Sequence, residues 1–383
     1  MPRADATERL RIVLVSCSRS ELTDSLGDPS PEVARAAIRR LEEIEGRHAA
    51  PALRARLLDA DLSLVPDIAK ALRRIGDTSA LDLAVDGLSD GSYVRRLAGA
   101  RALGALADPR AADALRSTLL DDIAGVRTAA LDALAQLGAD ADTAGACAPL
   151  LSDPDAQVRI SAVRAVSRTA TRPGLLLGSV ADDEDRGVRF EVAGHLGGLP
   201  DPAAAALLAD PDVQVREAAA LASNAGQADV LCGLLIEDRS SKVRRAAART
   251  LGSLDDERTG DMLVPGIEDP DAIVRVVVLE GLERALTHEG AARRLVRELL
   301  ADRPERRRAS VYALARLKTP EAATEIWRLA DDPNPDVRVA LLDCARTLLP
   351  DSEPLLRYMA TDPNSDVRNS ARNRLLRNPA CNA

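Results

Sequence analysis

Apolar residues recur along this chain with the spacing of helices that bury one side. In one stretch they fall at Val126, Ala130, Leu134 and Leu137, which are four, eight and eleven places apart from the first. Because an α-helix turns once in about 3.6 residues, these positions line one face. The stretches are rich in Ala, Leu and Arg and show little period-two alternation, which is typical of helices. The pattern predicts an all-α protein.

A short motif precedes each of these stretches and returns along the chain. It contains an Asp, often a Pro, a short polar turn and then Val-Arg, as in residues 153–159. The units repeat at roughly 30 residues, and a fixed period of that size indicates a repeat protein. The Val positions are Val33, Val65, Val94, Val126, Val158, Val188, Val215, Val243, Val274, Val337 and Val367, with Arg307 in place of Val in one weaker unit. About twelve units are expected over roughly residues 7–378.

Each unit is interpreted as two helices, A and B, so about 24 helices are expected. Around Val158, helix A is expected near residues 142–151 and helix B near 156–169. Asp155 stands at the N-cap of helix B, where its side chain would accept free backbone N–H groups. The same place is held by Ser30, Asp212, Asp271, Asn334 and Asn364.

Pro and Gly mark the helix ends. Pro31 and Pro335 follow their caps directly, at the first helical position, where a missing N–H costs nothing. Helices are expected to end in a left-handed residue at Gly46, Gly76, Gly138 and Gly226.

An Asp and an Arg hold fixed places around each Val. The Asp lies five places before the Val, in the turn, and the Arg follows the Val on the first turn of helix B. We expect each guanidinium to reach the Asp of its own or the adjacent unit, since Arg and carboxylate form charge-assisted hydrogen bonds. The expected ladder includes Asp153, Arg159, Asp210, Arg216, Asp269, Arg275, Asp332 and Arg338, and in the weaker unit Asp302 and Arg308.

This motif resembles HEAT repeats, in particular the short bacterial HEAT-like type also found in phycobilisome lyases. The resemblance covers almost the whole chain and concerns the fold more than any activity. We predict an all-α, right-handed α-solenoid (a superhelix) of about twelve two-helix HEAT-like repeats.

The solenoid is expected to form one domain over residues 1–383, with irregular N-terminal units over 1–107 and regular units over 108–383. The shortest interval between motifs runs from Val188 to Val215, and a Gly-rich stretch at 194–198 precedes it. We expect a bend near residues 186–212 for this reason.

The amino-acid composition limits the classes of function that the protein can have. The chain has 383 residues, 1% aromatic residues and a net charge of −9, so it lacks the basic field of a typical nucleic-acid-binding protein. Its five Cys residues are widely spaced and contain no C-x-x-C pair, so neither a disulfide framework nor a zinc site is indicated. No early apolar run is long enough to span a membrane or form a signal peptide. We expect a cytoplasmic monomer without metal or cofactor and without a membrane partner.

Candidate chemistry is sparse. His288-Glu289 is similar to the His-Glu pairs of HEAT-type diiron hydroxylases, but those proteins have several such pairs and this chain has one. The segment 293–308 is rich in Arg and could bind phosphate, which leaves a nucleic-acid-binding or DNA-repair protein as an alternative. An accessory lyase or a chaperone of a biosynthetic enzyme is a further alternative. No catalytic residue is assigned.

We expect a non-catalytic scaffold or adaptor that binds a protein or peptide on the concave face, which the B helices line in this family. Helical geometry places the second, sixth and ninth residues after each Val on the open side of helix B. The expected binding residues are Ile160, Arg164, Phe190, Arg245, Arg249, Val276, Glu280, Arg316, Val339 and Arg346. The apolar members either form a row of pockets or pack between neighbouring B helices.

Overall fold

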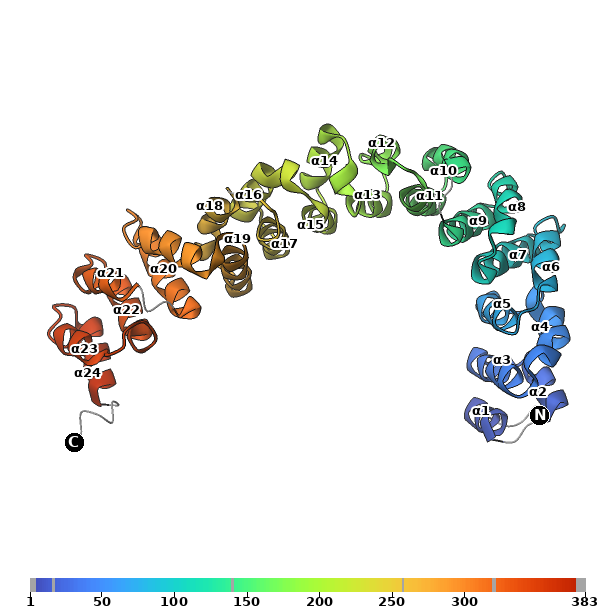
Figure 1. Ribbon diagram of the computed structural model, residues 1–383, viewed down its shortest axis with the longest axis horizontal. Coiled ribbons are helices and arrows are strands. Elements are labelled where there is room, and N and C mark those ends of the chain that lie inside the picture. The colour runs from blue at the N-terminus through green and yellow to red at the C-terminus, as the bar shows by residue number, and fades with distance from the viewer. Residues whose placement is uncertain (1–4, 16–17, 139–140, 257, 319–321, 377–383) are drawn as a thin grey trace. The chain divides into compact units, whose positions relative to one another are not determined.

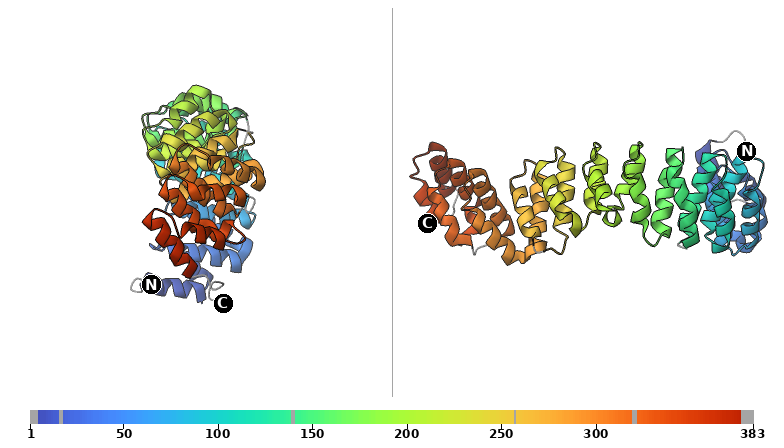
Figure 2. Two further views of the ribbon diagram at one scale, coloured as in Figure 1. Left: turned by 90° about the vertical axis from the view of Figure 1, so that its left-hand side faces the viewer. Right: turned by 90° about the horizontal axis from the view of Figure 1, so that it is seen from above.

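The computed structural model describes residues 5–15, 18–138, 141–256, 258–318 and 322–376, with the backbone alone at 141 and 285–289. In this part of the chain every regular element is a helix. The chain forms two compact units, Met1–Leu207 and Leu208–Ala383. Each unit is a stack of short helices lying side by side (Figure 1, Figure 2). The expected all-α solenoid is confirmed; the bend near residues 186–212 concerns the junction of the two units and stays a prediction.

The helices of the first unit are α1 (Ala6–Val15), α2 (Arg19–Ser25), α3 (Pro31–Glu45), α4 (Ala50–Leu57), α5 (Val65–Arg74), α6 (Ser79–Gly87), α7 (Tyr93–Leu106), α8 (Ala112–Thr118), α9 (Ala124–Leu137), α10 (Ala141–Cys147), α11 (Ala156–Thr169), α12 (Pro173–Leu177), α13 (Arg186–Ala193) and α14 (Asp201–Leu208), the last of which ends at the boundary. Those of the second unit are α15 (Val213–Ala222), α16 (Ala228–Glu237), α17 (Ser241–Leu251), α18 (Thr259–Leu263), α19 (Ala272–Glu298), α20 (Pro304–Leu317), α21 (Ala323–Trp327), α22 (Pro335–Leu348), α23 (Glu353–Met359) and α24 (Ser365–Leu376).

The helices form two layers within each unit, visible in Figure 1. One layer contains the B helices, which are α1, α3, α5, α7, α9, α11 and α13 in the first unit and α15, α17, the first part of α19, α20, α22 and α24 in the second. The other layer contains the shorter A helices. Several A helices end as 3₁₀ turns, such as Ala148–Ser152 after α10 and Val264–Glu268 after α18. Pro149 and Pro265 lie in these turns, and a proline cannot donate the hydrogen bond of a continuing α-helix.

The B helices bury the predicted apolar stripe. Val126, Val158, Val243 and Val337 are each fully buried. The residues four places on, such as Ala130 and Ala247, are fully buried as well. Small side chains there let successive helices approach closely, so the core consists of aliphatic side chains between the two layers.

Five of the six predicted helix caps are confirmed. Helix α11 spans Ala156–Thr169 as expected, and the Asp155 carboxylate accepts hydrogen bonds from the backbone N–H groups of Gln157 and Val158. Asp212, Asp271, Asn334 and Asn364 also accept such bonds. The prediction for Ser30 is wrong, since its side chain makes no capping bond; the Asp28 carboxylate accepts the Ser30 N–H instead.

Three of the four predicted left-handed glycines have positive φ angles, namely Gly46, Gly76 and Gly138. Gly226 does not, because it lies inside a 3₁₀ turn, Ala225–Gln227, that begins at an Asn224 cap. The local Asn–Gln capping box therefore starts an element at the place where a helix end was expected.

Helix α19 belongs to two repeats. A straight helix of 27 residues would be about 40 Å long. The Arg306 side chain nevertheless reaches both Glu268, just before α19 begins, and Glu298, its last residue. The two ends therefore lie close together, so the first part of α19 serves as a B helix and its last part as the A helix that precedes α20.

The motif before α20 lies one residue earlier than the sequence interpretation placed it. Helix α20 begins at Pro304 after an Arg303 N-cap, just as α22 begins at Pro335 after Asn334. Arg306 thus takes the Val position and Arg307 the ladder position, so the assignment of Arg308 and Asp302 to the ladder is wrong. The Pro sets the register because it is tolerated at the first helical position and not further inside.

Ladder arginines connect successive turns. Arg159 donates from Nε and Nη2 to the carboxylate of Asp183 in the next repeat, each at 2.8 Å, and from Nη1 to its own repeat's Asp153 carbonyl at 2.9 Å. The same bidentate arrangement joins Arg9 to Asp28, Arg96 to Asp121, Arg127 to Asp153, Arg216 to Asp238, Arg244 to Asp269, Arg307 to Asp332 and Arg338 to Asp362. From Arg96 onward, each of these guanidinium groups also donates to a carbonyl of its own turn, so it bonds to its own repeat and to the next.

We expect these rungs to make the protein sensitive to acid. Burial would raise the pKa of the Asp carboxyl groups, but the donating guanidinium and a backbone N–H outweigh it and hold the pKa below its ordinary value. This holds for Asp121, Asp153, Asp183, Asp238 and Asp362. The unfolded chain then binds more protons than the folded chain below about pH 4. The stabilisation is complete above that pH and is lost as the pH falls through the folded pKa values.

Urea unfolding followed by circular dichroism at several pH values checks this expectation. The free energy of unfolding should fall steeply between about pH 4 and pH 2, and Asp153→Asn should reduce the steepness because one linked proton is removed. An unfolding free energy that stays constant down to pH 3 would contradict the expectation.

Candidate functional site

Several grooves lie on the surface formed by the described B helices, which we name the B face. A groove of about 660 Å³ lies between α19 and α20, and one of about 590 Å³ between α22 and α24. In the first unit, a groove of about 390 Å³ follows α5, α7 and α9, and one of about 290 Å³ lies between α3 and α5. Every groove is lined mainly by successive B helices of one unit, so the repeat itself generates them.

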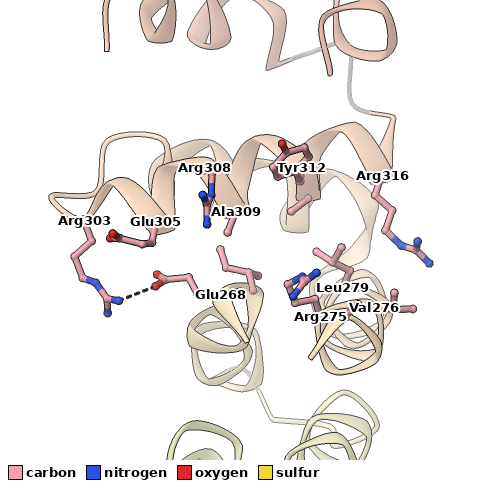
Figure 3. Close-up of a pocket in the computed structure, with 13 residues that line it drawn as sticks. Glu268, Arg275, Val276, Leu279, Arg303, Glu305, Arg308, Ala309, Tyr312 and Arg316 are labelled. Carbon is pink, nitrogen blue, oxygen red and sulfur yellow. Dashed lines mark ion pairs between the residues drawn. The ribbon is translucent and has the colours of Figure 1, made fainter. Parts of the chain in front are cut away.

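The α19–α20 groove has an apolar floor and a charged rim (Figure 3). Val276 and Leu279 of α19 face Ala309 and Ala313 of α20 across it. The charged lining consists of Arg275, Arg303, Arg308 and Arg316 against Glu268 and Glu305. Guanidinium groups therefore outnumber carboxylates in this groove, although the sequence as a whole is acidic.

The pairing of these charges is uneven. Glu268 accepts from Arg303 at 3.0 Å and from Arg306 at 2.6 Å, so its carboxylate is neutralised. In the described part of the chain, Arg275, Arg308 and Arg316 have no carboxylate within ion-pair distance. These three guanidinium groups are available to an anionic ligand.

Tyr312 adds a fixed aromatic ring to the same groove. Its hydroxyl donates to the Asp343 carboxylate at 2.9 Å, and burial together with this carboxylate raises its pKa to about 12. The phenol therefore stays protonated at neutral pH, and the ring is held in place while it remains 44% exposed. An exposed, immobilised ring can contact an apolar group of a ligand at low entropic cost.

The predicted binding residues of the second unit lie on the B face in different settings. Val276 and Arg316 line the α19–α20 groove and Arg346 lines the α22–α24 groove. Glu280 and Arg249 are exposed, whereas Arg245 is half-buried beside Glu217, 3.9 Å from its carboxylate, and Val339 is half-buried. The structure thus brings Val276 and Arg316 together in one groove.

Three predicted binding residues belong to the first unit. Phe190 is 47% exposed, and Arg164 donates to the Glu191 carboxylate at 2.9 Å. Ile160 is half-buried, and its side chain lies against Gly187 of the next B helix. The apolar positions therefore differ: Ile160 packs between helices, whereas Phe190 faces outward.

Sequence reasoning missed Arg308, Tyr312 and Arg275 as groove residues. Because the register was shifted by one residue, Arg308 was assigned to the ladder and Tyr312 was not placed on the open side of its helix. Arg275 was assigned to the ladder as well, but among the described residues it donates to the Asp269 and Pro270 carbonyls and to no carboxylate. Aligning Pro304 with Pro335 would have identified all three.

The Arg-rich segment 293–308 is mostly engaged in ion pairs. Arg294 pairs with Asp261 and Glu298, Arg303 and Arg306 with Glu268, and Arg307 with Asp332. Four of the seven arginines in this segment are therefore paired with carboxylates.

The Cys and His side chains described next lie in packed environments. Burial and the neighbouring Asp343 raise the pKa of the Cys344 thiol to about 12, and burial lowers the pKa of His195. Among the described residues, no three His, Cys, Asp or Glu side chains gather as metal ligands, and no helix has the length and apolarity to cross a membrane. The side chains of His288 and Glu289 lie outside the described residues.

The fold and the repeated rungs define an α-helical repeat protein that presents a grooved face. The family model for HEAT repeats matches residues 19–100, 67–135, 84–167, 207–283 and 260–342, which together exceed half of the chain. The chain belongs to the HEAT-repeat family. No curated protein matches it significantly.

Solved structures show the same type of fold. A mutant of Kap121p is 13% identical and matches 97% of this chain and 45% of its own, with a TM-score of 0.53. Importin beta is 13% identical over 92% of this chain and 60% of its own, with a TM-score of 0.48. YibA of Escherichia coli is 20% identical over 74% of this chain and 99% of its own, with a TM-score of 0.47. At these identities the likeness concerns the fold alone.

Proposed function

We propose that this protein is a cytoplasmic, non-catalytic scaffold or adaptor that binds a protein or peptide on its B face. The observation that carries the proposal is the position of the grooves: four of them open on the B face, each between successive B helices. Concave sites that combine an apolar floor with a few placed polar groups are typical binding sites.

Rigid display is the proposed mechanism. The bidentate rungs hold the first turn of eight B helices against the next repeat, as Arg244 does with Asp269 and Arg338 with Asp362. Side chains further along the same helices then project from a fixed backbone. Each repeat contributes a few contacts, and little ordering entropy is lost on binding because the surface is preorganised.

A peptide or a protein segment fits this surface better than a small molecule. The grooves follow the B helices and are open to solvent, and exposed apolar residues accompany charged ones on the same layer. Tyr312 and Leu221 are 44% and 49% exposed on α20 and α15. Exposed apolar side chains flanked by charges are a recurring feature of peptide-binding solenoids and helical grooves.

Charge reversal on the B face tests the proposal. We expect Arg245→Glu combined with Arg249→Glu to reduce capture of the partner by about tenfold or more, since it replaces two cations with anions on the binding surface. The measurement is quantitative mass spectrometry of proteins retained from a lysate of the source cells by immobilised wild-type and variant chains.

The matched control carries the same charge change on the A layer. Arg297 is exposed near the end of α19, and Arg328 lies in the turn after α21, 64% exposed in its side chain. Arg297→Glu combined with Arg328→Glu should leave capture unchanged, and thermal unfolding should be alike for both double variants. Partners lost equally from both variants, or from neither, would contradict a binding site on the B face.

A further inference from the structure

One exposed position on the B face of the first unit is cationic in three successive repeats. Arg39 of α3, Lys70 of α5 and Arg101 of α7 are exposed and follow one another at intervals of 31 residues. The residues two places before the first two, Ala37 and Ile68, are fully buried. The equal spacing therefore places the three cations at the same position of successive repeats, and we name them the cation row.

The cation row lacks the counter-charges that neighbouring basic residues have. Beside it, Arg35 pairs with Asp67 at 2.9 Å, and Arg74 pairs with Glu42. Arg101 donates from Nη1 to a backbone carbonyl in the turn before α5 at 3.1 Å. Among the described residues, no carboxylate lies within ion-pair distance of any member of the row. A chain with a net charge of −9 thus leaves three aligned cations uncompensated.

The acidic residues near the row set its limits. Asp132 of α9 holds the next equivalent position, again 31 residues on, so a negative charge follows three positive ones. The Ser63 hydroxyl and backbone N–H lower the pKa of the Asp61 carboxyl in the turn before α5, and Arg101 contributes less to this shift. The row therefore remains available to an anionic partner over three repeats.

The row lies along two adjoining grooves. Arg39 lines the α3–α5 groove, Arg101 lines the groove along α5, α7 and α9, and Lys70 lines both. These helices lie side by side in one layer of the first unit (Figure 1). Small or apolar side chains such as Ile38 and Pro66 line the grooves between the cations. A bound segment can therefore pass from one cation to the next over an apolar floor.

The distance between successive cations selects the conformation of the bound segment. Helices that pack together, as α3, α5 and α7 do, have axes about 8–10 Å apart. In a polyproline II segment every third side chain points the same way, about 9 Å further on. Side chains that share a face of a β-strand are about 7 Å apart, and neighbours on a helix face about 5–6 Å. Polyproline II therefore matches the repeat best.

We propose that the cation row binds an acidic segment of a protein partner in the polyproline II conformation, with a carboxylate at every third residue. One carboxylate pairs with each of Arg39, Lys70 and Arg101. The short apolar residues between the carboxylates lie on the floor of the two grooves. This inference rests on the proposed scaffold function and names the chemistry of the segment that is bound.

An acidic peptide fits the row better than a nucleic-acid strand does. Proteins that bind single strands combine cations with aromatic side chains on which the bases stack. No aromatic side chain is among the described residues that line the two grooves. Asp67 and Asp132 also line them and would repel a continuous chain of phosphates.

Two peptides of the same composition test the spacing. The labelled peptide Glu-Pro-Pro-Glu-Pro-Pro-Glu should bind the full-length protein at low ionic strength. Its isomer Pro-Pro-Glu-Glu-Glu-Pro-Pro should bind about fivefold or more less tightly, because its three carboxylates point in three directions. Fluorescence anisotropy measures both affinities. Equal binding of the two isomers overturns the proposal, since net charge alone would then account for the attraction.

Charge reversal at the centre of the row tests its position. Lys70→Glu should weaken binding of the evenly spaced peptide by about fivefold or more, because it replaces an attraction with a repulsion. Arg73→Glu is the matched control, since Arg73 is exposed on the same helix but is not among the residues that line either groove. The control should change the affinity by at most about twofold. Equal effects of the two substitutions overturn the proposal.

Extending the row tests the proposal through a gain of binding. Asp132→Lys should tighten binding of the longer peptide Glu-Pro-Pro-Glu-Pro-Pro-Glu-Pro-Pro-Glu by about threefold or more, because a fourth carboxylate then meets a cation. Tighter binding of a ten-nucleotide oligothymidylate than of this peptide by the wild type overturns the proposal in favour of nucleic acid. If capture from a lysate depends on Arg245 and Arg249 while the two peptide isomers bind alike, this inference fails and the scaffold function stands.

Discussion

Asp269→Ala is expected to lower the free energy of unfolding of the second unit by about 3 kcal/mol or more. Asp269 and its partner Arg244 are 7% and 9% exposed, and their hydrogen bonds measure 2.7 and 3.0 Å. Removing the carboxylate leaves a buried guanidinium without a counter-charge, and the cost of that unpaired charge dominates. Urea unfolding followed by circular dichroism measures the effect.

An exposed ion pair in the same unit provides the matched control. Asp229 pairs with Arg258 at 3.3 Å, and their side chains are 80% and 58% exposed. Asp229→Ala should change the unfolding free energy by at most about 1 kcal/mol, because exposed pairs contribute little. The double variant Arg244→Met with Asp269→Leu should lose less than Asp269→Ala alone, since it leaves no unpaired charge. Equal effects of Asp269→Ala and Asp229→Ala would show that the rungs do not stabilise the stack.

Gly252→Ala is expected to be similarly damaging, at about 2–3 kcal/mol, for a steric reason. Gly252 follows α17 and lies directly against Gly281 of α19, so an added Cβ would overlap the Gly281 Cα. The obstacle is backbone and cannot rotate away, so the two B helices must separate. Separation would also disturb the rung between Arg244 and Asp269, which joins the same two repeats.

Gly233→Ala is the control for this substitution. Gly233 lies inside α16, and an added Cβ would meet no atom within 4 Å. Because alanine favours the helix by about 1 kcal/mol over glycine, Gly233→Ala should be neutral or stabilising. Thermal and urea unfolding of both variants would separate the two cases, and a stable Gly252→Ala protein would refute the close contact between α17 and α19.

The helices could be predicted from the sequence because local signals agree with one another. The apolar stripe, the Asp155 cap and the Val position all indicate a helix over 156–169, and α11 has these bounds. Where two signals conflicted, the prediction was wrong. Before α20 the Asp302 and Arg308 pair suggested one register, whereas Pro304 set another, since proline fixes the first helical position.

The candidate site was less predictable because it depends on contacts between repeats. Helical geometry placed Val276 and Arg316 on the open side of their helices, but the groove requires the spacing between α19 and α20. The sequence also left open whether an arginine reaches the Asp of its own or the next repeat. Arg159 bonds to the carbonyl of one and the carboxylate of the other, a division that only side-chain positions reveal.

Binding on the B face can be measured through the affinity of the captured partner. Isothermal titration of the purified partner into the full-length chain gives its Kd for the wild type and the two charge-reversed double variants. If the partner binds the B face, its Kd should increase by about tenfold or more for Arg245→Glu with Arg249→Glu and stay unchanged for Arg297→Glu with Arg328→Glu. The reverse pattern would place the binding surface on the A layer and rule out a binding site on the B face.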